Sequence, residues 1–264
     1  MLAILRPVWI YRGFVLGSVK REFQSRYRNS LLGAAWIFFQ PLAQILVYTI
    51  VFSQIMHAKL PGVASTFGYS IHLCAGILTW GLFAEITTRS QGMFLENANL
   101  LKKLNFPRLC LPVTIVAIGL LNFAIVFGLF TSFLIVTGNF PGLVYVCLVP
   151  LIALLVVFGA SLGLILGVLN VFFRDVGQLF SIVITFWFWL TPIVYPVSIL
   201  PERVKDIIAL NPMVNLIEAV QGVLVLGEWP QFRGLLYLAT LAIVLSAFGL
   251  RLFRSRVGEM VDEL

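Results

Sequence analysis

Long stretches without any charged residue are the feature that most constrains this chain. Five of them occur, at 29–58, 60–84, 109–173, 176–201 and 234–250. A helix needs about 20 predominantly apolar residues to cross the hydrocarbon core of a bilayer. Charged residues make up only 11% of the chain, whereas a soluble domain usually has about 25%. The sequence therefore predicts an all-α polytopic membrane protein.

The longest uncharged run is long enough for two membrane spans. Gly138-Asn139-Phe140-Pro141-Gly142 lies in its middle and is typical of a turn. Each of the other runs is long enough for one span. We therefore expect six transmembrane helices, near residues 32–56, 68–88, 110–136, 143–169, 177–195 and 234–252.

Lys and Arg residues indicate how these spans are oriented. If the N-terminus is cytoplasmic, fourteen of the eighteen fall in inner segments and four in outer ones. Basic residues are enriched in cytoplasmic loops, so we expect both termini in the cytoplasm. The net charge of +7 then reflects topology, and we expect no nucleic-acid partner because no soluble basic face is apparent.

Two segments outside the expected spans are predicted not to cross the membrane. In residues 1–30, apolar and basic residues alternate around a helix, which is typical of an amphipathic helix in the cytoplasmic interface. That helix is either a plain anchor or has a role in gating or substrate entry. Prolines divide residues 196–233 into two short helices, Arg203–Leu210 and Val214–Leu226. These either re-enter the outer leaflet or form a surface lid.

A short polar stretch, MFLENANLLKKLNFPR at residues 93–108, separates the second and third expected spans. Because those spans run in opposite directions, residues 89–109 must turn in the cytoplasm. An asparagine can cap a short helix there, and Pro107 limits its far end. The helix places three leucines on one face and turns two lysines away from it; these are Leu100, Leu101 and Leu104, and Lys102 and Lys103. The stretch is either an ordered docking element or a solvated basic loop.

Motifs for catalysis or nucleotide binding are missing from the sequence. No P-loop (GxxxxGKS or GxxxxGKT), HExxH or GxSxG pattern occurs. Glu85 is the one acid well inside an apolar run, and Arg89 lies four residues on, where the two can pair. Three small glycines, Gly159, Gly163 and Gly167, allow a close helix approach, either within one subunit or at a dimer seam. We expect a non-catalytic chain that binds no cofactor or metal and depends on another chain for energy.

Aromatic residues cluster in the first and fifth expected spans. Those facing a lumen would offer flat surfaces on which sugar rings can stack, and those facing the interface would form an aromatic belt. Candidates for a polysaccharide path are Trp36, Phe39, Trp187 and Phe188.

Five stretches together resemble the membrane subunit of polysaccharide-exporting ABC transporters, the Wzm-like type-2 permeases of O-antigen, capsule or teichoic acid export. The resemblance covers nearly the whole chain, in order and at sensible spacing. It departs from the family at Gln221, where relatives often carry a basic residue. The stretches are RYRNSLLGAAWIFFQPL (26–42), NLLKKLNFPR (99–108), FFRDVGQL (172–179), FWLTPIVYP (188–196) and LNPMVNLIEAVQGVLV (210–225).

The resemblance implies one permease domain over 1–264, in the bacterial inner membrane, acting as a homodimer with two copies of a separate ATPase that binds ATP and magnesium. It implies export of a lipid-linked polysaccharide. A drug or lipid exporter of the same superfamily is an alternative, and a membrane enzyme acting on lipid-linked sugars is a third. Coupling to the ATPase is expected at Glu96, Asn99, Leu100, Leu101, Lys102, Lys103, Leu104 and Arg108. The anionic substrate is expected to be received at Arg26, Arg28, Leu32 and Gly33, unless these arginines only anchor the chain.

Overall fold

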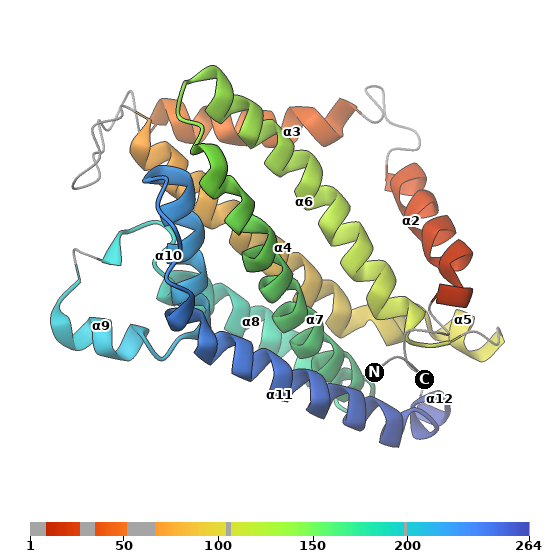
Figure 1. The fold of residues 1–264 in the computed structure, drawn as a ribbon. Helices are drawn as coiled ribbons and strands as arrows, with labels where there is room; N and C mark the ends of the chain where they lie inside the picture. Colours follow the sequence, from red (N-terminus) through yellow and green to blue (C-terminus); the bar gives the residue numbers. More distant parts are fainter. Residues whose placement is uncertain (1–8, 27–34, 52–66, 104–106, 198–199, 264) are drawn as a thin grey trace.

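The computed structural model of the protein describes residues 9–26, 35–51, 67–103, 107–197 and 200–263. These residues are almost entirely helical, and they contain no strand (Figure 1). The predicted all-α fold is therefore confirmed. The elements in chain order are α2 (Arg12–Arg26), α3 (Trp36–Tyr48), α4 (Gly68–Glu96), α5 (Ala98–Lys103), α6 (Cys110–Val136), η3 (Gly142–Cys147), α7 (Leu148–Phe172), α8 (Asp175–Leu190), α9 (Glu202–Ile208), α10 (Pro212–Val225), α11 (Phe232–Arg256) and α12 (Glu259–Glu263).

Within the described residues, four helical segments are long and apolar enough to cross a membrane: α4, α6, η3 with α7, and α11. The bent pair α9 and α10 would make a fifth. The expected spans at 32–56 and 177–195 coincide with the shorter apolar helices α3 and α8. With 16 residues, α8 is about 24 Å long, less than the bilayer core of about 30 Å. The predicted count of six spans is therefore not confirmed.

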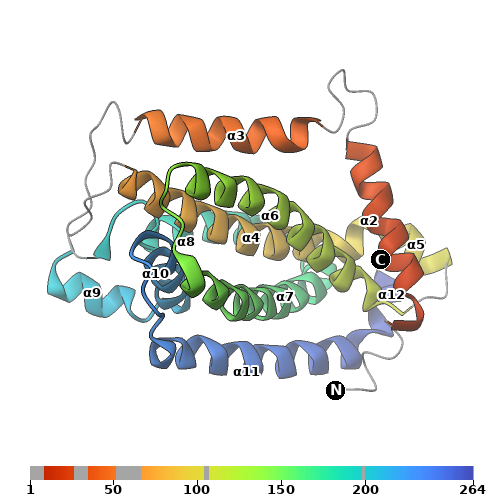
Figure 2. The same cartoon turned by 45° about the horizontal axis from the view of Figure 1, so that its top comes forward.

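Helix α4 lies at the centre of the bundle. In its most apolar 18-residue stretch 67% of the residues are buried, compared with 22% in α11. Figure 2 shows α3 on one side of α4 and α6, and α11 along the opposite side of α7. Two buried polar side chains of α4 are satisfied within the helix. Thr79 and Thr87 donate hydrogen bonds to the carbonyls of Ala75 and Phe83, at 2.7 and 2.8 Å.

Close packing of α4 on α7 depends on the predicted glycines. A Cβ at Gly163 would lie 2.5 Å from the Cβ of Ser90, and one at Gly167 would lie 2.6 Å from the Ser90 carbonyl oxygen. Gly159 of α7 faces side chains of α4, with the Phe83 ring nearest. The three glycines therefore pack within one subunit, which was one of the two predicted uses.

The two ends of the bundle differ in character. One end holds α2, α5 and α12, together with Arg89, Lys102 and Arg256, and is called the basic end (Figure 1). The opposite end holds η3, α9 and α10 and is called the hairpin end. Two short helices were predicted here, and α9 and α10 match them. They meet at 104°. Helix α9 ends at Ile208, and Asn211 caps the start of α10 by accepting a hydrogen bond from the Met213 amide at 3.0 Å.

The N-terminal helix α2 lies at the edge of the basic end, next to α6. Within α2, Val15 is buried and Leu16 is 67% exposed, and Trp9, which precedes the helix, is 70% exposed. The guanidinium of Arg12 lies 5.2 Å from the centre of the Trp9 ring. Exposed apolar, aromatic and basic side chains together are compatible with the membrane interface, and the location of α2 in that interface stays a prediction.

Candidate functional site

The predicted coupling stretch forms a break between two helices. Helix α4 ends at Glu96 and α5 begins at Ala98. Asn97 joins them: its side-chain amide donates to the Met93 carbonyl of α4 at 2.8 Å, and its own carbonyl accepts the first hydrogen bonds of α5, from Leu100 and Leu101. An asparagine was predicted to cap the start of the short helix, and its side chain instead closes the end of the preceding one.

The leucines of α5 do not share one exposed face. Leu101 is buried, with 8% of its surface exposed, while Leu100 is 39% exposed. Leu101 belongs to a compact apolar cluster at the basic end, which we call the basic-end core. The apolar knob expected from three leucines is therefore reduced to Leu100 among the described residues, because Leu104 lies outside them. The members of the basic-end core are Met93, Phe94, Leu101, Leu111, Ile115, Leu164, Val168, Val171, Phe253 and Met260.

The remaining coupling candidates differ in how exposed they are. Glu96, Asn99 and Lys102 are exposed. Arg108 is half-buried and donates a hydrogen bond to the Val257 carbonyl, just after α11 ends. It therefore ties the start of α6 to the C-terminal segment. The side chain of Lys103 lies outside the described residues.

Substrate-receiving residues were expected between α2 and α3. Arg26 is the last residue of α2, but its side chain lies outside the described part of the protein. Arg28, Leu32 and Gly33 also lie outside it. Their predicted role therefore stays a prediction.

The four aromatic candidates divide into two pairs. On α3, Trp36 and Phe39 are 47% and 53% exposed. On α8, Trp187 and Phe188 are half-buried and point into an aromatic cluster on α4 and α7. The ring of Trp80 lies 6.0 Å from Trp187 and 5.8 Å from Phe188, between ring centres.

Trp187 is also anchored at its polar atom. Its indole N–H donates to Oδ1 of Asn211 at 2.8 Å, and the Asn211 amide donates to the Thr191 hydroxyl at 2.9 Å. Trp187 thus joins α8 to the start of α10. The outward aromatics of α8 are instead Phe186 and Trp189, which are 66% and 61% exposed.

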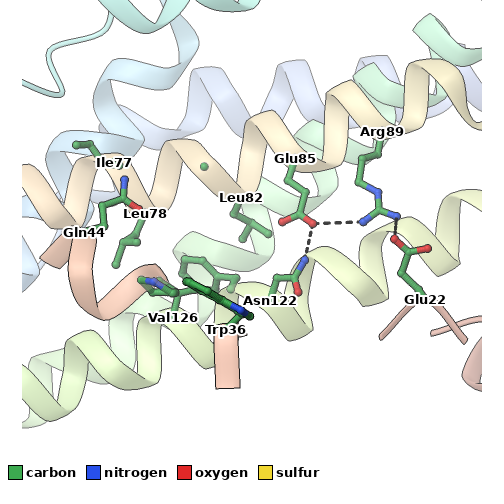
Figure 3. Close-up of a pocket in the computed structure, with 13 residues that line it drawn as sticks. Glu22, Trp36, Gln44, Ile77, Leu78, Leu82, Glu85, Arg89, Asn122 and Val126 are labelled. Carbon is green, nitrogen blue, oxygen red and sulfur yellow. Dashed lines mark hydrogen bonds and ion pairs between the residues drawn. The ribbon is translucent and has the colours of Figure 1, made fainter. Parts of the chain in front are cut away.

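A cavity of about 520 Å³ opens among α2, α3, α4 and α6 (Figure 3). At its polar side, Nη2 of Arg89 lies 2.8 Å from a carboxylate oxygen of Glu22, and Nη1 lies 3.5 Å from Oε1 of Glu85. The Asn122 amide donates to the same Oε1 at 2.6 Å. The predicted pairing of Glu85 with Arg89 is present, and the shorter of the two ion pairs of Arg89 is made with α2.

Sequence reasoning missed Glu22, Asn122 and Met260. Glu22 is the only acid among the first 84 residues, which was a signal that it has a specific basic partner. Asn122 interrupts a long apolar run with an amide, which was a weaker signal of the same kind. Nothing in the sequence pattern indicated that Met260, close to the end of the chain, is 1% exposed in the basic-end core.

Comparison with known proteins places this chain among transporters. Residues 15–225 match the family described as ABC-2 type transporter. Over 267 aligned residues, covering 100% of both chains, the protein is 31% identical to "O-antigen export system permease protein RfbA" of Myxococcus xanthus. It is 32% identical, over 88% of both chains, to a protein of the same name from Klebsiella pneumoniae. It is also 25% identical to "Polysialic acid transport protein KpsM" of Escherichia coli, over 91% of this chain and 92% of the other.

Proposed function

The chain belongs to the ABC-2 type transporter family, and we propose that it is the membrane permease of an ATP-driven exporter of a lipid-linked, O-antigen-like polysaccharide. The full-length likeness to a permease named for O-antigen export carries this proposal. The likeness to a polysialic acid transport protein supports a polysaccharide as the cargo. The apolar helices of the bundle suit a permease that spans the membrane.

A separate ATPase, in two copies that bind ATP and magnesium, supplies the energy. Helix α5 is the element that supports this partner best. It follows directly from the central helix α4, and it presents Asn99, Leu100 and Lys102 outward. A helix of six residues does not form stably alone, so the buried Leu101 holds it in place. A push on α5 would therefore reach α4 through the basic-end core, which contains Leu101 together with Met93 and Phe94 of α4.

The permease acts as a homodimer in the bacterial inner membrane, with both termini in the cytoplasm. The gathering of basic residues at the end that holds α2, α5 and α12 supports this orientation, because cytoplasmic segments are enriched in Lys and Arg. The same end then faces the ATPase. A single subunit provides at most half of a path wide enough for a polymer.

The polymer passes along exposed aromatic side chains. On α3, Trp36 and Phe39 are exposed enough to contact a sugar ring. On α8, the half-buried Trp187 and Phe188 line the path less directly, because they pack against α4 and α7. Before α3, Arg26 and Arg28, with Leu32 and Gly33, receive the anionic carrier lipid, because Arg binds phosphate oxygens in a bidentate way.

Deletion of the gene in its host tests the function. Surface polymer should disappear and lipid-linked polymer should accumulate inside the cell, as measured by immunoblotting of intact and lysed cells. The wild-type gene should restore export, and a variant with Leu100→Asp should not. If surface polymer persists while export of a drug or a simple lipid is lost, the protein is an exporter of another class and the proposal is wrong.

A further inference from the structure

The cavity among α2, α3, α4 and α6 has a charged end and a mainly apolar end, where Gln44 is the one polar side chain among the described lining residues. Its wall on α4 runs from Ile77 and Leu78 to Glu85 and Arg89, a rise of about 18 Å at 1.5 Å per residue. The polar part points toward the basic end of the bundle (Figure 3). In a membrane protein such a gradient parallels one lipid leaflet, with headgroups at the polar end and chains toward the midplane.

The charges in the polar part are arranged as an acid, a base and an acid. Arg89 lies between Glu22 and Glu85, so the three side chains together carry a net charge of about −1 if all are ionised. All three side chains are partly exposed: Glu22, Arg89 and Glu85 are 40%, 31% and 26% exposed. Ionised groups at membrane depth are costly and usually functional.

The polar part of the cavity has hydrogen-bond acceptors and donors that the described residues leave unused. Among the described residues, the second carboxylate oxygen of Glu85 and the side-chain oxygen of Asn122 accept no hydrogen bond. A ligand that donates hydrogen bonds would fill them. A guanidinium has five N–H groups, so Arg89 keeps donors beyond those that face its two carboxylates. These can hold a phosphate oxygen.

We propose that this cavity binds the headgroup of a phospholipid that carries a primary ammonium, as phosphatidylethanolamine does. The ammonium donates to Glu85 and Asn122, the phosphodiester contacts Arg89, and the acyl chains follow the apolar wall at Ile77 and Leu78. A pyrophosphate or another polyanion is disfavoured, because it brings several negative charges to two carboxylates that one arginine only half neutralises. The site is independent of the polysaccharide export proposed above, and binding can be measured without it.

Native mass spectrometry of the full chain tests lipid selectivity. The purified protein is delipidated and offered phosphatidylethanolamine, phosphatidylcholine, phosphatidylglycerol or a monoglucosyl diacylglycerol, all with the same acyl chains. Phosphatidylethanolamine should be retained roughly 10-fold better than the others, because it alone combines a cation with N–H donors. Equal retention of phosphatidylglycerol would overturn the proposal. Preferential retention of the glucolipid would also overturn it, in favour of a site for neutral sugars.

Two pairs of variants locate the binding in this cavity. Glu85→Gln removes the charge and should abolish the roughly 10-fold preference, whereas Glu202→Gln removes an exposed acid on α9 and should not. Gly81→Leu should block the cavity without touching the charges, since Gly81 lines it and a Cβ there meets no atom within 4 Å. Gly128→Leu is the matched control, because Gly128 is also exposed with nothing within 4 Å of a Cβ. If Gly81→Leu binds phosphatidylethanolamine as Gly128→Leu does, the cavity is not the site.

Discussion

The ring of Phe94, near the end of α4, stacks on the ring of Phe253, near the end of α11, with 5.9 Å between ring centres and 20° between planes. Both rings belong to the basic-end core, which also contains Leu101 of α5 and Met260 of α12. The short helix proposed to meet the ATPase is therefore held by residues from far along the chain. Its position depends on the C-terminal segment.

Leu100 and Leu101 should separate partner binding from stability. Leu100→Asp should weaken capture of the ATPase in a pull-down and leave the thermal midpoint of the purified permease unchanged, because Leu100 is 39% exposed. Leu101→Ala should lower the free energy of unfolding by about 2–5 kcal/mol, as for other buried leucines. If Leu100→Asp retains the ATPase normally, α5 is not the docking element.

Met260 should support α5 from the C-terminal side. Met260→Ala removes a side chain that is 1% exposed, and we expect a loss of about 2–5 kcal/mol. Hydrogen exchange of the amides of Ala98–Lys103 should become faster in this variant. Glu263→Ala, at an exposed position of the same helix, should leave that exchange unchanged. Equal protection in the two variants would show that α12 does not brace α5.

Trp187 and Trp189 should differ although they are two residues apart. Trp187→Ala removes ring contacts with Trp80 and Phe83 and the hydrogen bond to Asn211, so we expect a loss of about 3–5 kcal/mol in stability. Trp189→Ala, at 61% exposure, should leave the thermal midpoint within a few degrees. Because the fold is retained, a loss of export by the Trp189→Ala variant would indicate that Trp189 contacts the polymer. Similar midpoints for the two variants would contradict the anchoring role of Trp187.

Gly167 should tolerate no added side chain. A Cβ at this position would lie 2.6 Å from the backbone oxygen of Ser90, so Gly167→Ala must separate α7 from α4 and should cost about 1–3 kcal/mol. Gly128→Ala, where a Cβ meets nothing within 4 Å, should stabilise its helix by about 0.5–1 kcal/mol. Thermal unfolding in detergent compares the two. A Gly167→Ala variant as stable as the wild type would show that the two helices can separate without loss.

The resemblance to a known family and the pattern of charges can be recognised from the sequence alone. The same is true of the two short helices around Asn211-Pro212, because a proline at the first position of a helix and an asparagine before it mark a helix start. The burial of Leu101 in the basic-end core cannot be recognised in this way. Three leucines at helical spacing suggest one apolar face, but they do not show which part of it a distant segment will cover.

By itself, the sequence determined that the chain is helical and lies in a membrane. Uncharged runs of this length must bond their backbone groups internally in lipid, and a helix does so without help from the rest of the chain. The tertiary structure alone decided which side chains meet. Glu22 and Arg89 are 67 residues apart, and Phe94 and Phe253 are still farther apart, so no local pattern encodes their contact. Such contacts depend on how α2 packs against α6 and on how α11 and α12 pack against α7, and packing is a property of the whole bundle.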